Sequence, residues 1–203
     1  MNAQRLLAEF QVFARPDFLS NAECTSLRRE ADAGRRATAE RYDNDSGKNT
    51  ANENTFTATL LPATAELPNR RFEQLKPALE RHFGLELKGW DAPTVFVYEQ
   101  GAGLKPHRDV HPDSPTHEPE RVRRRKVSVV VFLNAEDELP GPEEFRGGHL
   151  RLYDLGMSEQ DTKPRGIGVR PRKGLLVAFK SALPHEVTRV TEGTRYCLIA
   201  WFH

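Results

Sequence analysis

Two histidines and two aspartates lie close together in the sequence KPHRDVHPD, residues 105–113. Successive side chains of a strand point to opposite faces, so His107 and Asp109 would share a face with Cα atoms about 6.5–7 Å apart. An imidazole and a carboxylate at this separation can chelate one metal ion. His111 is a competing ligand, but it precedes a proline-rich stretch and we place it in a loop beyond the strand.

A third protein ligand is needed to complete a metal site of this kind. His185, which precedes an apolar strand-like run, is the candidate. Two histidines and one carboxylate on one side of a metal leave other coordination positions open, which is the arrangement expected for Fe(II) oxygenases. Zinc is the chemical alternative.

Arg195 begins the run RYCLIAWF, ten residues after His185. The two-residue period of a strand places Arg195, Cys197, Ile199 and Trp201 on one face. A guanidinium group at the rim of a β core needs an anionic partner, because burying an unpaired charge is costly and its planar fork suits a carboxylate. Either an acidic side chain of the protein or a bound dicarboxylic cosubstrate would satisfy it.

The elements that carry these residues are predicted to be mainly β. From about residue 90, strand-like runs alternate with turns, which favours a sandwich or jelly roll with one open mouth. Before it, apolar positions at helical spacing predict helices within 22–34 and 67–87. Residues 38–56 are polar and nearly devoid of large aliphatic side chains, and they predict a long loop.

Composition limits the classes of fold and partner. A chain of 203 residues with 37% hydrophobic content can bury one sizeable core, so we expect one domain over 1–203, with helices and a lid loop in 1–89 and the β core in 90–203. The 30 basic and 29 acidic residues argue against nucleic-acid binding, although the run 121–126 is basic. The absence of a leader-like or membrane-spanning apolar run predicts a cytoplasmic protein. Cys24 and Cys197 are expected to be reduced core thiols.

Taken together, these residues resemble the iron(II)- and 2-oxoglutarate-dependent dioxygenases, and within them the prolyl 4-hydroxylase-like branch. The matching set is His107-x-Asp109, then His185, with Arg195 ten residues later and Trp201 six beyond that. Weaker matches occur elsewhere, at Tyr98, Gly101, Leu133-Asn134, Gly147-Gly148-x-Leu150, Pro171-x-x-Gly174, Phe179 and FLSNAECTSL near residue 20. A single H-x-D is weak evidence, but the ordered set with its spacings is specific.

The resemblance implies a double-stranded β-helix, a cupin-like jelly roll, in which His107, Asp109 and His185 bind Fe(II). It implies that Arg195 holds the distal carboxylate of 2-oxoglutarate and that Tyr98 donates to the same cosubstrate. The implied reaction uses O2 to hydroxylate an aliphatic C–H bond and releases succinate and CO2, with ascorbate as a candidate reductant. No catalytic residue beyond the metal ligands is implied.

The chain departs from the family pattern at Phe132, where many relatives have a tyrosine. Arg195 would then have one hydroxyl donor fewer beside it, for which Ser128 or Thr188 would compensate. Residues 38–56 resemble the mobile segment that closes over the substrate in prolyl hydroxylases.

The candidate substrate contacts are Arg41 and Tyr42 in this segment, together with Trp201 and His149. A prolyl residue in a peptide or an amino-acid-like molecule is the expected substrate. The alternatives are a free amino acid, a natural-product intermediate, or a non-catalytic metal-binding scaffold of the cupin type.

Overall fold

The computed structural model describes residues 10–34, 36–43, 48–111, 119–154 and 166–203. Its helices are α2 (Asn21–Ala33), α3 (Pro62–Phe83) and the short α4 (Glu120–Arg123). Among the described residues the two long helices come before residue 84 and most strands after residue 93, although three strands also lie in the N-terminal part.

Three antiparallel sheets make up the β part. The large sheet has the order β1-β10-β6-β13-β4-β3-β2, and the smaller sheets have the orders β5-β11-β8-β9 and β12-β7. The strands of the large sheet are β1 (Phe13–Arg15), β2 (Arg36–Asp43), β3 (Lys48–Thr59), β4 (Thr94–Tyr98), β6 (Val127–Phe132), β10 (Leu176–Lys180) and β13 (Arg195–Phe202). The strands of the smaller sheets are β5 (Leu104–His107), β7 (Phe145–Gly147), β8 (Leu150–Tyr153), β9 (Gly166–Val169), β11 (His185–Val187) and β12 (Val190–Gly193).

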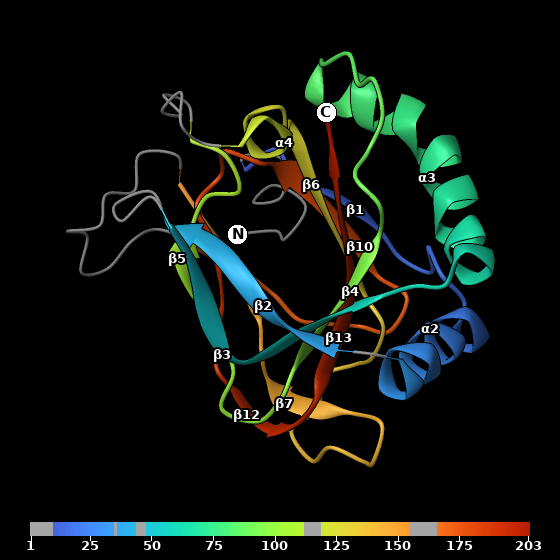
Figure 1. Cartoon of the computed structure of the whole chain (residues 1–203), viewed down its shortest axis with the longest axis vertical. Helices are drawn as coiled ribbons and strands as arrows, with labels where there is room; N and C mark the ends of the chain where they lie inside the picture. Colours follow the sequence, from blue (N-terminus) through green and yellow to red (C-terminus); the bar gives the residue numbers. More distant parts are fainter. Residues whose placement is uncertain (1–9, 35, 44–47, 112–118, 155–165) are drawn as a thin grey trace.

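The centre of the large sheet is buried on both faces, as β6 shows. Val129 and Val131 point to one face and join a core cluster with the helices α2 and α3. Val130 and Phe132 point to the other face and pack with residues of the four-stranded sheet. Because side chains alternate along a strand, β6 serves both cores and reads as a continuous apolar run, VSVVVF. In Figure 1 the two helices lie together on one side of the large sheet.

The two long helices form where the sequence provides start and stop signals. Ser20 caps α2 with a capping box: its hydroxyl accepts from the Glu23 backbone N–H, and the Glu23 carboxylate accepts from the Ser20 backbone N–H. Helix α3 starts with Pro62 in its first turn and ends at Gly84, whose left-handed conformation favours glycine. The predicted α3 therefore exists, five residues longer at its N-terminal side than expected.

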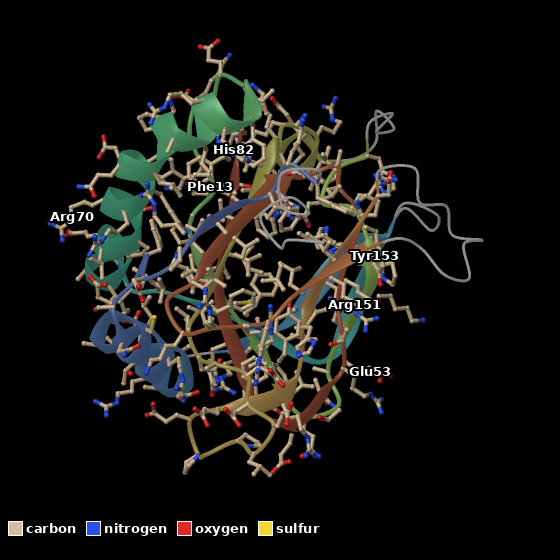
Figure 2. All side chains as sticks on the ribbon, turned by 180° about the vertical axis from the view of Figure 1, so that it is seen from behind. Phe13, Glu53, Arg70, His82, Arg151 and Tyr153 are labelled. Carbon is tan, nitrogen blue, oxygen red and sulfur yellow. The ribbon has the colours of Figure 1, made fainter. Side chains whose placement is uncertain are left out.

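Strand β1 and helix α3 meet on the helical side of the molecule. The rings of Phe13 and His82 pack edge to face with centroids 5.4 Å apart, and Figure 2 shows both residues there, with Arg70 on the outer side of α3. Arg151 and Tyr153, on β8 of the four-stranded sheet, lie on the opposite side of the molecule in the same view. The β sheets thus separate the helices from the surface formed by β8.

The prediction of a loop over residues 38–56 is wrong for the described part of that segment. These residues belong to β2 and β3, a hairpin that extends the large sheet through pairing of β3 with β4. An edge hairpin needs few large aliphatic residues, because it continues an existing sheet and buries small side chains such as Ala39, Thr55 and Ala58. Threonine also suits a strand, so a polar composition was a poor guide here.

Two further expectations can be compared with the structure. Cys24 and Cys197 are buried free thiols, as predicted. Among the described residues, no helix is both long enough and apolar enough to cross a bilayer.

Candidate metal centre

His107, Asp109 and His185 come together at the end of β5 and the start of β11. These strands are neighbours in the four-stranded sheet, and their register places His185 directly opposite His107. Nε2 of His107 lies 3.7 Å from one carboxylate oxygen of Asp109, and Nε2 of His185 lies 3.6 Å from the other. The three donor atoms all lie within 4.8 Å of one another, in the one such cluster among the described residues.

Hydrogen bonds to the backbone orient both imidazole rings. Nδ1 of His107 lies 2.9 Å from the Lys105 carbonyl oxygen, and Nδ1 of His185 lies 2.9 Å from the Leu183 carbonyl oxygen. A carbonyl can only accept, so Nδ1 carries the hydrogen in each ring, and in the neutral form of the ring Nε2 keeps its lone pair. Both lone pairs are then available to a metal, and the carbonyl partners fix the tautomer as they do in known metal sites.

Asp109 is held by a chain of hydroxyl groups behind it. The Ser128 hydroxyl donates to a carboxylate oxygen of Asp109 at 2.6 Å, and Ser128 and Ser181 share a hydrogen bond of 2.9 Å. Burial disfavours the charged carboxylate, but the two imidazoles, the Arg125 guanidinium and the Ser128 hydroxyl favour it, and the pKa of Asp109 falls to about 2. Asp109 is therefore ionised near neutral pH, as a metal ligand must be.

Arg195 places a positive charge in the same cavity. It is only 1% exposed, and its guanidinium carbon lies 4.6 Å from the ring centroid of Tyr98 and 5.3 Å from that of Phe132. Its Nη1 donates to the Cys197 sulfur at 3.2 Å, while its buried Nε has no hydrogen-bond partner among the described residues. A guanidinium without a carboxylate beside it is prepared to bind an anion.

Two of the weaker sequence motifs, Leu133-Asn134 and Gly147-Gly148, help to position Arg195. The Asn134 side chain accepts from the Tyr196 backbone N–H and donates to the Thr194 carbonyl, so it fixes the chain on both sides of Arg195. Gly148 has a φ of +59°, and a Cβ added there would lie 2.9 Å from Cδ of Arg195. The Leu-Asn and Gly-Gly pairs thus act on the position of this one side chain.

The metal centre and Arg195 open into one cavity of about 560 Å³. Its lining comes from both facing sheets and from the α4 region, and it includes Tyr98 and Trp201. Burial raises the pKa of Tyr98, so its hydroxyl stays protonated and able to donate. The β2–β3 hairpin also lines the cavity, with residues that include Thr38, Glu40 and Thr57.

Arg125 is a cavity residue that the sequence did not single out. It belongs to a basic run that reads as solvated, yet its side chain is only 12% exposed. Its guanidinium carbon lies 3.8 Å from the Trp201 ring centroid, a close cation–π contact, and its Nη1 donates to the Asp109 carbonyl at 3.4 Å. No signal in the sequence indicated this role, because the contacts with Trp201 and Asp109 that distinguish Arg125 from its neighbours form only in the folded chain.

Three expected substrate residues are placed differently or are not described. His149 does not belong to the cavity lining; its Nε2 lies 3.6 Å from a Glu136 carboxylate oxygen, and its backbone N–H donates to the Thr188 hydroxyl. The backbone of Arg41 and Tyr42 lies in β2, but their side chains are outside the described part of the chain, as is Asp113.

The two hydroxyls that were expected to compensate for Phe132 have other hydrogen-bond partners in the structure. Ser128 hydrogen bonds to Asp109 and Ser181, so its hydroxyl serves the carboxylate and not Arg195. Thr188 accepts from the backbone at His149. Ser128 lies on β6 and Thr188 lies between β11 and β12, and the aromatic face of Phe132 lies beside the guanidinium.

With the fold and the site described, comparison with known proteins identifies the class. The model of the 2OG-Fe(II) oxygenase superfamily matches residues 93–203. The chain therefore belongs to the 2OG-Fe(II) oxygenase superfamily. It is also 28% identical to a PKHD-type hydroxylase of Pseudomonas fluorescens over 109 residues, a match that spans 54% of this chain and 42% of that protein.

Solved structures share the fold over nearly the whole chain. A prolyl-4-hydroxylase of Pseudomonas putida superposes with a TM-score of 0.68 and 24% identity, covering 97% of this chain and 94% of that one. A prolyl hydroxylase of Trichoplax adhaerens was solved with a peptide of the hypoxia inducible factor oxygen degradation domain. It superposes with a TM-score of 0.67 and 19% identity, covering 98% of this chain and 86% of that one. These likenesses confirm the predicted double-stranded β-helix.

Proposed function

We propose that the protein is an Fe(II)- and 2-oxoglutarate-dependent hydroxylase of an aliphatic C–H bond. The observation that carries the proposal is the convergence of His107, Asp109 and His185 in one cavity with the buried guanidinium of Arg195. Membership of the 2OG-Fe(II) oxygenase superfamily supports the same assignment.

The donor set fits an Fe(II) ion. Separations of 3.6–3.7 Å between ligand atoms are shorter than the roughly 4.2 Å expected for two ligands on opposite sides of an ion with bonds of about 2.1 Å. Asp109 would therefore bind beside each histidine and not opposite it, and three protein ligands would leave positions for other molecules. Zinc would accept the same donors, and the superfamily favours iron. When bound, Fe(II) supplies the O2 chemistry, coupled to conversion of 2-oxoglutarate to succinate and CO2.

The other residues of the cavity would bind and orient. Arg195 would bind the distal carboxylate of 2-oxoglutarate, and the protonated Tyr98 hydroxyl would donate to the same cosubstrate. Ser128 would hold the Asp109 carboxylate in place, and the apolar side chains of Val130, Phe179 and others in the lining would exclude water.

We propose a prolyl residue of a peptide or protein as the substrate. The cavity lining continues across the inner face of four neighbouring strands, β13, β4, β3 and β2. With about 4.8 Å between neighbouring strands, this face is roughly 14 Å wide, which is the length of about four residues of extended peptide. The hydroxylases with the same fold are named for action on proline. A free amino acid or a natural-product intermediate is the alternative, and ascorbate dependence and a cytoplasmic location remain predictions.

The test combines metal binding with turnover. Purified protein is titrated with Fe(II) under anaerobic conditions, then mixed with O2, 2-oxoglutarate and a panel of proline-containing peptides and free amino acids. We expect succinate formation and a mass gain of one oxygen atom on a peptide. Asp109→Ala should abolish most Fe(II) binding with the fold intact, whereas Asp137→Ala, outside the cavity lining, should not.

Two results would contradict the proposal. Iron-loaded protein that forms no succinate would support the non-catalytic scaffold. Unchanged Fe(II) affinity in Asp109→Ala would remove this carboxylate from the ligand set.

A further inference from the structure

The hydrogen bond between Arg195 and Cys197 has no role in the function proposed so far. Both residues lie on the inner face of β13, two positions apart, and both are buried. Nη1 of Arg195 lies 3.2 Å from the Cys197 sulfur, well inside the limit for a bond to sulfur. Arg195 also has a side-chain hydrogen bond with Tyr98, so the Cys197 sulfur is one of two side-chain partners that bear on where the guanidinium points.

The register of the sheet holds the sulfur in place. Cys197 pairs with Phe96 on β4 and with Phe132 on β6, and it is completely buried between these strands. The guanidinium is stacked near the rings of Tyr98 and Phe132. Two aromatic faces restrict the plane of the guanidinium but leave it free to rotate within that plane. A hydrogen bond to a fixed acceptor removes this remaining freedom.

The chemistry of the acceptor matters as much as its position. Burial raises the pKa of the Cys197 thiol, so it is neutral near pH 7 even though Arg195 favours the thiolate. A neutral sulfur is a weak acceptor and leaves the positive charge of the guanidinium uncompensated. An acidic residue at the same place would form an internal ion pair and would compete with any anionic ligand.

We propose that Cys197 is a positioning residue that orients the Arg195 guanidinium for the distal carboxylate of the cosubstrate while leaving its charge available. The inference rests on the proposed function, since it assumes that Arg195 binds 2-oxoglutarate. It goes beyond that function because it assigns a role in cosubstrate affinity to a residue that binds neither the metal nor the substrate.

The experiment compares three variants at this position with a matched control. Cys197→Ala removes the acceptor, Cys197→Ser keeps a neutral acceptor of similar size, and Cys197→Asp introduces a charge. Cys24→Ala is the control, because Cys24 is an equally buried free thiol in the other core cluster. The dissociation constant of 2-oxoglutarate is measured by calorimetry on the Mn(II)-loaded protein, with the Mn(II) affinity and the unfolding temperature measured alongside.

The expected result is specific to the cosubstrate. Losing one hydrogen bond of about 1.4 kcal/mol corresponds to about a tenfold change in affinity, so Cys197→Ala should raise the dissociation constant of 2-oxoglutarate about tenfold. Cys197→Ser should stay within about threefold of the original protein by retaining an acceptor. Cys197→Asp should lose measurable binding, while all three keep their Mn(II) affinity. In turnover, KM for 2-oxoglutarate should rise and kcat should stay near its original value.

Several outcomes overturn the inference. Equal 2-oxoglutarate affinity of Cys197→Ala and Cys24→Ala would contradict it. A loss of Mn(II) affinity in Cys197→Ala as large as the loss of 2-oxoglutarate affinity would indicate a structural role alone. Tight binding by a folded Cys197→Asp would also contradict it. In each of these cases the original protein still binds 2-oxoglutarate and the proposed function stands. Absence of 2-oxoglutarate binding by the original protein would refute the proposed function and this inference together.

Discussion

Replacing Ser128 by alanine tests whether the hydroxyl chain behind the metal centre contributes to metal affinity. Ser128 is 1% exposed and donates to Asp109 at 2.6 Å, and Ser181 lies 2.9 Å beyond it. The Ser128→Ala variant removes only the hydroxyl oxygen from a strand that is apolar on both sides. The change should therefore leave the fold of β6 intact and deprive the carboxylate of one donor.

The size of the effect follows from the charge of the acceptor. A hydrogen bond to an ionised group contributes about 1.5–3 kcal/mol, which corresponds to roughly a 10- to 150-fold change in an equilibrium constant. Residues that hydrogen bond to metal ligands in other proteins cost about 10- to 100-fold in affinity when removed. We therefore expect Ser128→Ala to weaken Fe(II) binding by about 10- to 100-fold.

Anaerobic titration with Fe(II), or with Mn(II) followed by electron paramagnetic resonance, measures this affinity directly. Ser181→Ala is the graded control: its hydroxyl does not contact the Asp109 carboxylate, so the loss should be smaller than for Ser128→Ala. The unfolding temperature of each variant separates lost affinity from lost structure. If Ser128→Ala binds metal as tightly as the original protein, the Ser128 hydroxyl does not orient the ligand and this reasoning is refuted.

Two further substitutions test whether Arg195 binds the cosubstrate and whether Gly148 positions it. Arg195→Gln should raise the KM for 2-oxoglutarate by at least about tenfold, from the loss of charge-assisted hydrogen bonds, while Fe(II) affinity stays the same; equal cosubstrate affinity would exclude Arg195 as its binding residue. Gly148→Ala should both lower the unfolding temperature and raise this KM, because its Cβ would lie 2.9 Å from Cδ of Arg195 at a positive φ. Gly168→Ala is the matched control, since a Cβ there would meet no heavy atom within 4 Å, and an equal effect of the two glycine changes would contradict the contact with Arg195.

The proximity of His107 and Asp109 could be predicted from the sequence because they are only two residues apart. The strand geometry expected for the pair applies to His107 alone, because β5 ends there. Asp109 lies in the bend that follows, where its backbone N–H donates to the Ser181 carbonyl. The partnership with His185 depends on the register between β11 and β5. No local pattern determines which of many strands become neighbours, and the family resemblance provided this link.

The misjudged segments show where composition is a poor guide. Residues 38–56 lack large aliphatic side chains, yet β3 pairs with β4 and gains its stability from the sheet that it extends. Arg125 carries the same charge as its neighbours in the basic run, but it is buried against Trp201 by contacts that form only in the folded chain. In both cases tertiary context overrides a tendency read from neighbouring residues.

The two faces of strand β13 limit which sequence changes the protein can accept during evolution. One side of it carries Arg195, Cys197 and the cavity residues Ile199 and Trp201, and the other side fills the core beneath the helices with Leu198, Phe202 and their neighbours. A register shift by one residue would exchange the two faces of β13. It would place the Arg195 guanidinium in the apolar core and the Phe202 ring in the cavity. We therefore expect insertions in β13 to disrupt both the core and the anion-binding residue, whereas the β2–β3 hairpin at the edge of the sheet can vary in sequence with less effect on the core.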